Sequence, residues 1–197
     1  MDRRPLVIAA GALLVVACLC VCLASVAIIT LRRGDNLERA LAPLGDLCGG
    51  VGGGVAAAAV YSNAPRLHPV AIFVADAQGA YRLNPAGFNS NWQAQSVAEA
   101  ELVICIDEVR ETVIERCDYA LTDGATGVVE RIGVDVRFRV LAAHSGRELL
   151  RNSGIGLPRE CADEETFSDD LRQQTLRGHL VDAVAPAVAP LVAPVAP

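Results

Sequence analysis

The residues of this chain that could carry chemistry are its cysteines and histidines. Four of the seven cysteines, Cys48, Cys105, Cys117 and Cys161, are spread widely over the region after residue 33. An even number of distant cysteines predicts two disulfides in a protein outside the cytosol. A structural zinc site needs close cysteine pairs, and these four residues form none. We therefore predict disulfides, no metal and no cofactor.

Four cysteines permit three pairings, and the expected strands favour one of them. Cys105 lies in a predicted strand over 102–106, and Cys117 lies in a second over 112–121. A short turn between these strands would form a hairpin that sets Cys105 opposite Cys117. The other two cysteines would then pair with each other.

The three histidines match no catalytic motif, and no G-x-S-x-G or H-E-x-x-H pattern is present. His68 precedes Pro69 and an apolar run, where a structural role at the start of a strand competes with ligand contact. The single tryptophan, Trp92, lies in a loop rich in turn formers. We predict that the protein is not an enzyme. The alternatives are a pocket near His68 and Trp92 and, third, a hydrolase with an unrecognised site.

The clearest pattern is the alternation of apolar and charged residues over 128–142. Seven of the eight even positions are apolar, so the pattern predicts a strand with one buried and one solvated face. Arg131, Arg137 and Arg139 fall on the solvated face. They could contact an anion or an acidic partner, and a solvated sheet surface explains them equally well.

The flanking segments predict an α+β domain with a mainly antiparallel sheet. Asp123-Gly124 and Ser145-Gly146 predict turns on either side of the alternating strand. Ser168 can cap a C-terminal helix, and the following Pro/Ala/Val-rich residues 185–197 predict an extended or disordered tail.

Residues 6–31 form an apolar run without a charge, bounded by arginines on both sides. About 20 residues of helix span a bilayer, so we predict a retained single-pass transmembrane helix that contacts lipid. A cleaved signal peptide and a lipoprotein signal ending at Cys18 are the alternatives. The arginines do not decide the orientation. The disulfide prediction favours a domain outside the cytoplasm at the cell membrane.

Composition excludes several functions. The formal charge is −6, which argues against nucleic-acid binding. All seventeen basic residues are arginine, so a lysine-dependent P-loop or Schiff-base mechanism is excluded. The abundance of Arg, Ala, Val and Gly is typical of a GC-rich bacterial genome.

The chain resembles a family of uncharacterised bacterial proteins that are membrane-anchored or secreted and have no assigned activity. The resemblance implies an extracytoplasmic β-rich domain and no catalytic residue. It rests on His68-Pro69, Trp92, residues 101–105, 117–119 and 137–146, and the segment from Pro158 to Cys161.

Four regions are expected along the chain. They are an anchor at 1–33, a stalk and Gly-rich linker at 34–60, the β-rich domain at 61–184 and the tail at 185–197. The expected function is interaction with an unknown protein or small-molecule partner. The alternative is a small-ligand-binding or envelope-assembly module.

Overall fold

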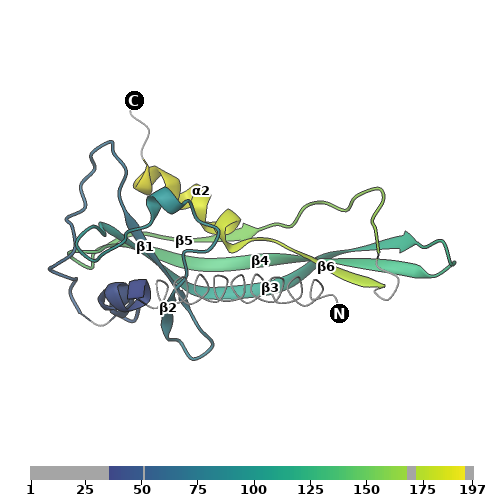
Figure 1. Ribbon diagram of the computed structural model, residues 1–197, viewed down its shortest axis with the longest axis horizontal. Coiled ribbons are helices and arrows are strands. Elements are labelled where there is room, and N and C mark those ends of the chain that lie inside the picture. Colours follow the sequence, from purple (N-terminus) through teal and green to yellow (C-terminus); the bar gives the residue numbers. More distant parts are fainter. Residues whose placement is uncertain (1–35, 51, 168–171, 194–197) are drawn as a thin grey trace, which may run out of the picture. The chain divides into compact units, whose positions relative to one another are not determined.

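The computed structural model describes residues 36–50, 52–167 and 172–193 (Figure 1). The chain divides into two compact units, Met1–Ala40 and Leu41–Pro197. The predicted membrane segment at 6–31 lies outside the described residues. Within the described ranges, no helix combines the length and the hydropathy needed to cross a bilayer.

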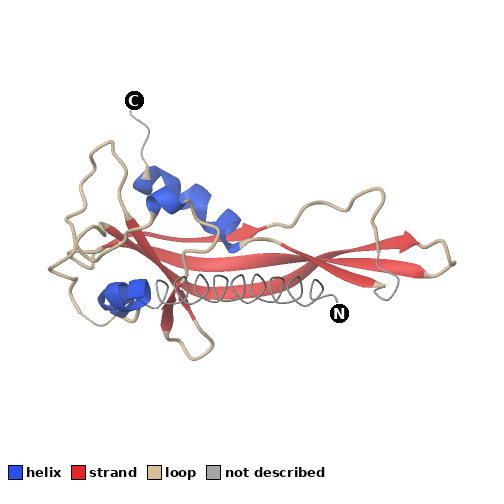
Figure 2. Cartoon of the chain, viewed as in Figure 1, coloured by secondary structure: helices blue, strands red, loops and turns tan. Residues whose placement is uncertain are grey.

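The second unit is an α+β domain with a mainly antiparallel sheet and a C-terminal helix, as predicted (Figure 2). Its described strands follow the order β2-β1-β3-β4-β5, and β6 also pairs with β4. Two of the pairings, β1 with β3 and β4 with β6, are parallel. The elements are β1 (Val70–Ala75), β2 (Tyr81–Leu83), the short helix η1 (Ser90–Trp92), β3 (Leu102–Ala120), β4 (Thr126–Ala142), β5 (Glu148–Gly156), β6 (Gln173–Arg177), α2 (Leu180–Val192) and a helix over 36–48.

The sheet is built on one long hairpin of β3 and β4. The turn predicted at Asp123-Gly124 is present, and Gly124 has a φ of +80°, which glycine adopts readily. The hairpin predicted between 102–106 and 112–121 is wrong, because these residues form the single strand β3. The turn predicted around residues 108–111 is absent, and these residues continue the strand after a β-bulge between Ile106 and Glu108.

This correction also changes the disulfide pairing. Cys105 and Cys117 lie twelve positions apart in one strand, which separates them by about 40 Å and excludes a bridge between them. The two predicted disulfides are present, but they join Cys48 to Cys105 and Cys117 to Cys161. They close loops with sequence separations of 57 and 44 residues. Each loop corresponds to about 4 kcal/mol on the chain-entropy model.

The main core lies between α2 and one face of the sheet, which we call the α2 face. It contains alternate residues of the central strands and the buried residues of α2, among them Ile104, Phe138, Val184 and Val188. From Val134 to Val140 the even residues of β4 are buried, which confirms this part of the predicted alternation.

The extended tail predicted after residue 184 is wrong, because α2 continues to Val192 with Pro186 and Pro190 inside it. Each proline removes one helical hydrogen bond. Both prolines are exposed, so water can reach the carbonyl groups left unpaired. Val184, Val188 and Val192 recur every four residues on the buried side. Their packing on the sheet outweighs the poor helix propensity.

The segment before α2 also differs from the prediction. Residues 173–177 form the edge strand β6, where a helix starting at Ser168 was expected. Ser168 itself lies outside the described residues. The side chains of β6 alternate between exposed and half-buried, the period of a strand rather than a helix.

The opposite face of the sheet is covered at both ends. At one end Leu41, Leu44 and Leu47 of the 36–48 helix are buried, and Cys48 is bonded to β3. At the other end, residues 157–167 carry Cys161 and cover the odd positions of β4, including the fully buried Val129. The buried side of β4 therefore changes along its length.

The chain makes a tight crossing where β5 ends and α2 begins. Gly178 donates its backbone N–H to Ile132 O, and a Cβ on Gly178 would overlap the carbonyl of Gly156. A Cβ on Gly156 would overlap the carbonyl of His179. These two glycines let β5 and β6 meet end to end along β4.

We expect Gly178→Ala to lower the free energy of unfolding by about 2 kcal/mol or more, because the backbone must move apart to admit a methyl group. Urea unfolding of the full-length protein, followed by the fluorescence of its single tryptophan, measures the change. Gly53→Ala is the control, since nothing lies within 4 Å of a Cβ there. Equal stability of the two variants would contradict the proposed close approach.

Candidate functional site

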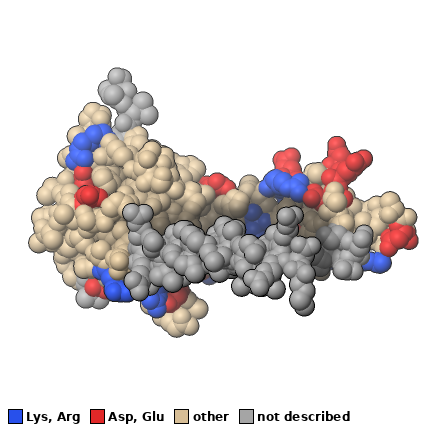
Figure 3. Space-filling view, viewed as in Figure 1, with Lys and Arg blue, Asp and Glu red and all other residues tan. Residues whose placement is uncertain are grey.

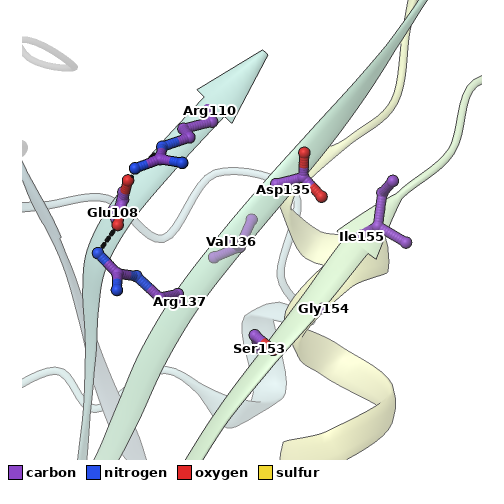
Figure 4. A pocket seen from close by; sticks show the side chains of 8 residues that line it. All are labelled: Glu108, Arg110, Asp135, Val136, Arg137, Ser153, Gly154 and Ile155. Carbon is purple, nitrogen blue, oxygen red and sulfur yellow. Dashed lines mark ion pairs between the residues drawn. The ribbon is translucent and has the colours of Figure 1, made fainter. Parts of the chain in front are cut away.

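Between its two covered ends, the face opposite α2 is left exposed on β3, β4 and β5. We call this region the open strip. It is formed by Glu108, Arg110, Asp135, Arg137, Ser153 and Ile155 (Figure 4). The register pairs Arg137 with both Glu108 and Ser153, and Asp135 with both Arg110 and Ile155. Directly opposed residues point to the same face, so the six side chains form one surface.

The carboxylate of Glu108 contacts both arginines of the open strip. Figure 4 shows Glu108 between Arg110 and Arg137, and it forms an ion pair with each of them. The arginine side chains stay 73% and 69% exposed, whereas that of Glu108 is 24% exposed. Asp135 accepts a hydrogen bond of 3.3 Å from Thr112. Two basic and two acidic groups make the strip neutral overall, so it does not select polyanions.

The open strip continues into an exposed apolar contact. A Cβ on Gly133 would lie 3.1 Å from Ile114 Cγ2 and 3.2 Å from Ile155 Cδ1, so the two isoleucines meet above Gly133. Ile114 and Ile155 remain 40% and 45% exposed. Charged and apolar groups therefore lie next to each other on this surface.

Two shallow hollows, of about 490 and 560 Å³, lie along the strip and share Arg137 and Ser153. The first is lined mainly by the residues of the open strip. The second extends toward Asp107, Arg151 and Asn152. Arg137 is thus the basic group at the centre of this surface.

The other two arginines predicted on the solvated face have internal partners. Arg139 donates to both carboxylate oxygens of Asp107, at 2.7 and 2.8 Å, and to Cys48 O at 2.8 Å. Arg131 forms an ion pair with Glu115 and donates to the carbonyls of Pro158 and Arg159. The structure therefore leaves Arg137 as the one of the three that reaches into solvent.

Asp107 is the central acceptor of a network that joins β2, β3 and β4. Burial alone would raise its pKa, but hydrogen bonds from Arg139 and Tyr81 outweigh burial and hold the pKa of Asp107 below its usual value. Burial and the hydrogen bond to Asp107 raise the pKa of Tyr81. The Tyr81 hydroxyl donates to Asp107 at 2.7 Å. This network lies next to one end of the open strip, because Arg139 is on the same face of β4 as Arg137.

His68 lies in the core, away from the open strip. It is fully buried, and its Nδ1 and Nε2 lie 2.7 Å from Glu101 Oε2 and 2.9 Å from Ala64 O. Arg66 Nη1 lies 2.5 Å from the other oxygen of Glu101. Both ring nitrogens of His68 therefore have an oxygen partner within hydrogen-bond distance. The pair joins the starts of the parallel strands β1 and β3.

Neither His68 nor Trp92 lines either hollow of the strip. Trp92 ends η1 and packs, partly buried, against the core. With both ring nitrogens of His68 engaged, the geometry favours a structural role for it. The predicted ligand contact of these two residues stays a prediction.

The sequence patterns did not single out Glu108, Asp107 or Ser153. Asp107 and Glu108 follow the apolar residues 102–106 directly, which made them resemble the start of a turn. The two acidic residues mark the bulge that redirects β3. In the sequence, the charged residues immediately after the apolar residues 102–106 are the one signal that could have indicated this site.

No model of a known protein family, no curated protein and no solved structure matches this chain. The family resemblance inferred from the sequence therefore stays a prediction.

We expect Asp107→Asn to destabilise the protein by about 1 kcal/mol at pH 7, because it weakens charged hydrogen bonds from Arg139. The folded pKa of Asp107 is lowered, so its stabilising effect is complete above the unfolded pKa and is lost as the pH falls through the folded pKa. The difference between wild type and variant should shrink below about pH 4. Urea unfolding at pH 7 and pH 3 measures it, and a constant difference would contradict the ionic role.

We expect Glu101→Gln to destabilise the protein by about 3 kcal/mol, because it leaves the buried His68 ring without its charged partner. Glu160→Gln, at an exposed position, serves as the control and should change stability by less than about 0.5 kcal/mol. Thermal or urea unfolding of both variants provides the measurement. Similar stabilities would show that the pair does not hold β1 and β3 together.

Proposed function

We propose that this chain is a single-pass bacterial membrane protein that presents a disulfide-stabilised domain outside the cytoplasm and binds a protein partner through the open strip. Residues 6–31 would anchor it in the bilayer. The domain would act by interaction rather than by catalysis.

The cysteine chemistry supports the location. Both disulfides join segments that are far apart in the sequence, and such bridges persist in oxidising compartments. The bridges also fix both covers of the exposed face, because Cys48 belongs to the 36–48 helix and Cys161 to the 157–167 segment. The disulfides thereby fix the positions of the covers on β3, at both ends of the open strip.

The observation that carries the proposal is the composition of the open strip. Arg137 lies at its centre and is highly exposed, and Ile114 and Ile155 lie further along the same face, beyond Asp135. An exposed arginine and exposed apolar side chains on one surface are typical of interface residues that contribute much of the binding energy. Because its charges are balanced, the strip fits a protein surface with residues of both signs better than an anion.

The acidic groups near the open strip are engaged by neighbouring side chains, which favours binding over catalysis. Glu108 forms ion pairs with two arginines, and Asp107 accepts hydrogen bonds from Arg139 and Tyr81. A general base requires a carboxylate or imidazole that is accessible to the substrate. These carboxylates already serve neighbouring side chains.

A small ligand is the second candidate, and the two hollows favour it. Volumes of about 490 and 560 Å³ fall within the range of ligand sites. The residues that line them are mainly charged or polar, and the hollows are shallow. Ligand sites, by contrast, are mostly apolar and enclose the ligand. This contrast is why a protein partner is proposed first.

A photo-crosslinking amino acid at Ser153 of the full-length protein, in membranes of its native host, tests the proposal. We expect a discrete cross-linked protein whose yield falls about tenfold in Arg137→Glu, because charge reversal removes the central basic group. Arg147→Glu, at an exposed position in the turn between β4 and β5, is the matched control and should keep the yield.

A second probe at Gln78, in the exposed turn between β1 and β2, reports non-specific capture. The same products from both probe positions, or equal losses in the two charge reversals, would contradict binding through the open strip. Loss of cross-linking only after a small-molecule extract is added would favour the ligand alternative.

A further inference from the structure

One edge of β3 is unpaired over much of its length. The strand pairs with β4 along its whole length, but β1 covers its other edge only from Leu102 to Ile106. Beyond Ile106, no described strand pairs with that edge. The residues at 109–116 are exposed, and alternate backbone N–H and C=O groups there point outward.

The unpaired stretch of β3 carries exposed apolar side chains. Val113 is 55% exposed, and Val109 and Ile114 are each 40% exposed. No proline occurs at 107–116, and the protection of this edge consists of charges of both signs and two β-bulges. Elsewhere on the domain, Figure 3 shows acidic and basic side chains next to one another.

The α2 face of this edge carries Glu111, Val113 and Arg116 as consecutive positions. They pair with Val134, Ile132 and Glu130 of β4, which all point to that face. Arg116 lies three positions after Val113, but the bulge between Val113 and Glu115 absorbs one of these positions. The row is therefore evenly spaced, with an acid on one side of the valine and a base on the other.

Such a row is complementary to itself when reversed. We propose that a second copy of this chain pairs along this edge, antiparallel, with its two-fold axis at Val113. The two Val113 side chains then face each other, and each Glu111 faces Arg116 of the other copy. On the opposite face, Thr112 meets Glu115, so no like charges are opposed. The row lies on the α2 face, whereas the open strip lies on the opposite face, although Arg110 of the strip belongs to the same stretch of β3.

Two other positions of the axis oppose like charges. Shifting the axis to Glu111 would place two carboxylates opposite each other, and shifting it to Arg110 would oppose two arginines. Both cost stability in a sheet. The arrangement at Val113 removes the most exposed apolar side chain of the edge from water.

Cysteine cross-linking of the full-length protein tests the pairing. The background carries Cys18→Ala, Cys20→Ala and Cys22→Ala, so that no other free thiol competes. Val113→Cys should give a covalent dimer in membranes under mild oxidation, with a yield at least fivefold above that of Thr122→Cys in the exposed turn. Thr112→Cys should stay near the control, because each Thr112 faces Glu115 of the other copy and not the other Thr112.

Charge exchange gives an independent readout that does not depend on oxidation. In analytical ultracentrifugation, Glu111→Arg and Arg116→Glu should each reduce the dimer fraction. The double variant should restore it, although it also loses the ion pair of Glu111 with Arg177. Far-UV circular dichroism and Trp92 fluorescence confirm folding.

A monomer at all concentrations would overturn the proposal, whether or not a strand of another protein binds this edge. Cross-linking at Thr112→Cys in preference to Val113→Cys would overturn the stated axis. A dimer that neither single charge change weakens would show that the copies associate elsewhere. Glu111 and Arg116 point to the α2 face, so their variants leave the open-strip side chains unchanged, and loss of the dimer is distinguishable from failure of the proposed partner binding.

Discussion

The hydrogen-bond ladder between β3 and β4 is the constraint on which the rest of the structure depends. It runs from Leu102 paired with Ala142 to Ala120 paired with Thr126, longer than any other pairing of the described sheet. Every other described strand except β2 pairs directly with one of these two. Because the ladder is longer than the core, its far half needs its own cover. The segment joining β5 to β6 provides that cover and is bonded through Cys117.

The two faces of the ladder differ in burial. The α2 face holds the main core, and the buried pair of His68 and Glu101 joins the strand starts at its edge. The other face has covers at both ends and leaves a charged strip between them, supported by Asp107 and Arg139. A buried ion pair contributes more to a defined arrangement than to net stability, since desolvation offsets much of the attraction. Its position at the junction of β1 and β3 fits that role.

Local patterns in the sequence predicted the class of fold, the turn at Asp123-Gly124, the existence of two disulfides and the burial of alternate residues from Val134 to Val140. They failed where distant contacts decide the outcome. The charges after Ile106 indicate a turn by themselves, yet β4 pairs with them as strand. Cysteine pairing followed that error, since it depends on which strands are continuous. Among the arginines, nothing in the alternation distinguishes Arg137 from Arg131 and Arg139, because their internal partners come from other parts of the chain.

The prolines of α2 have a consequence for the order in which the domain is assembled. A segment containing Pro186 and Pro190 does not hold a helix by itself, so α2 acquires its structure only on a sheet that already exists. It is also the last described element of the chain, and it follows the glycine crossing at Gly156 and Gly178. The sheet must therefore close before the helix docks. Until then, its core face is exposed to water and to any chaperone that binds apolar surfaces.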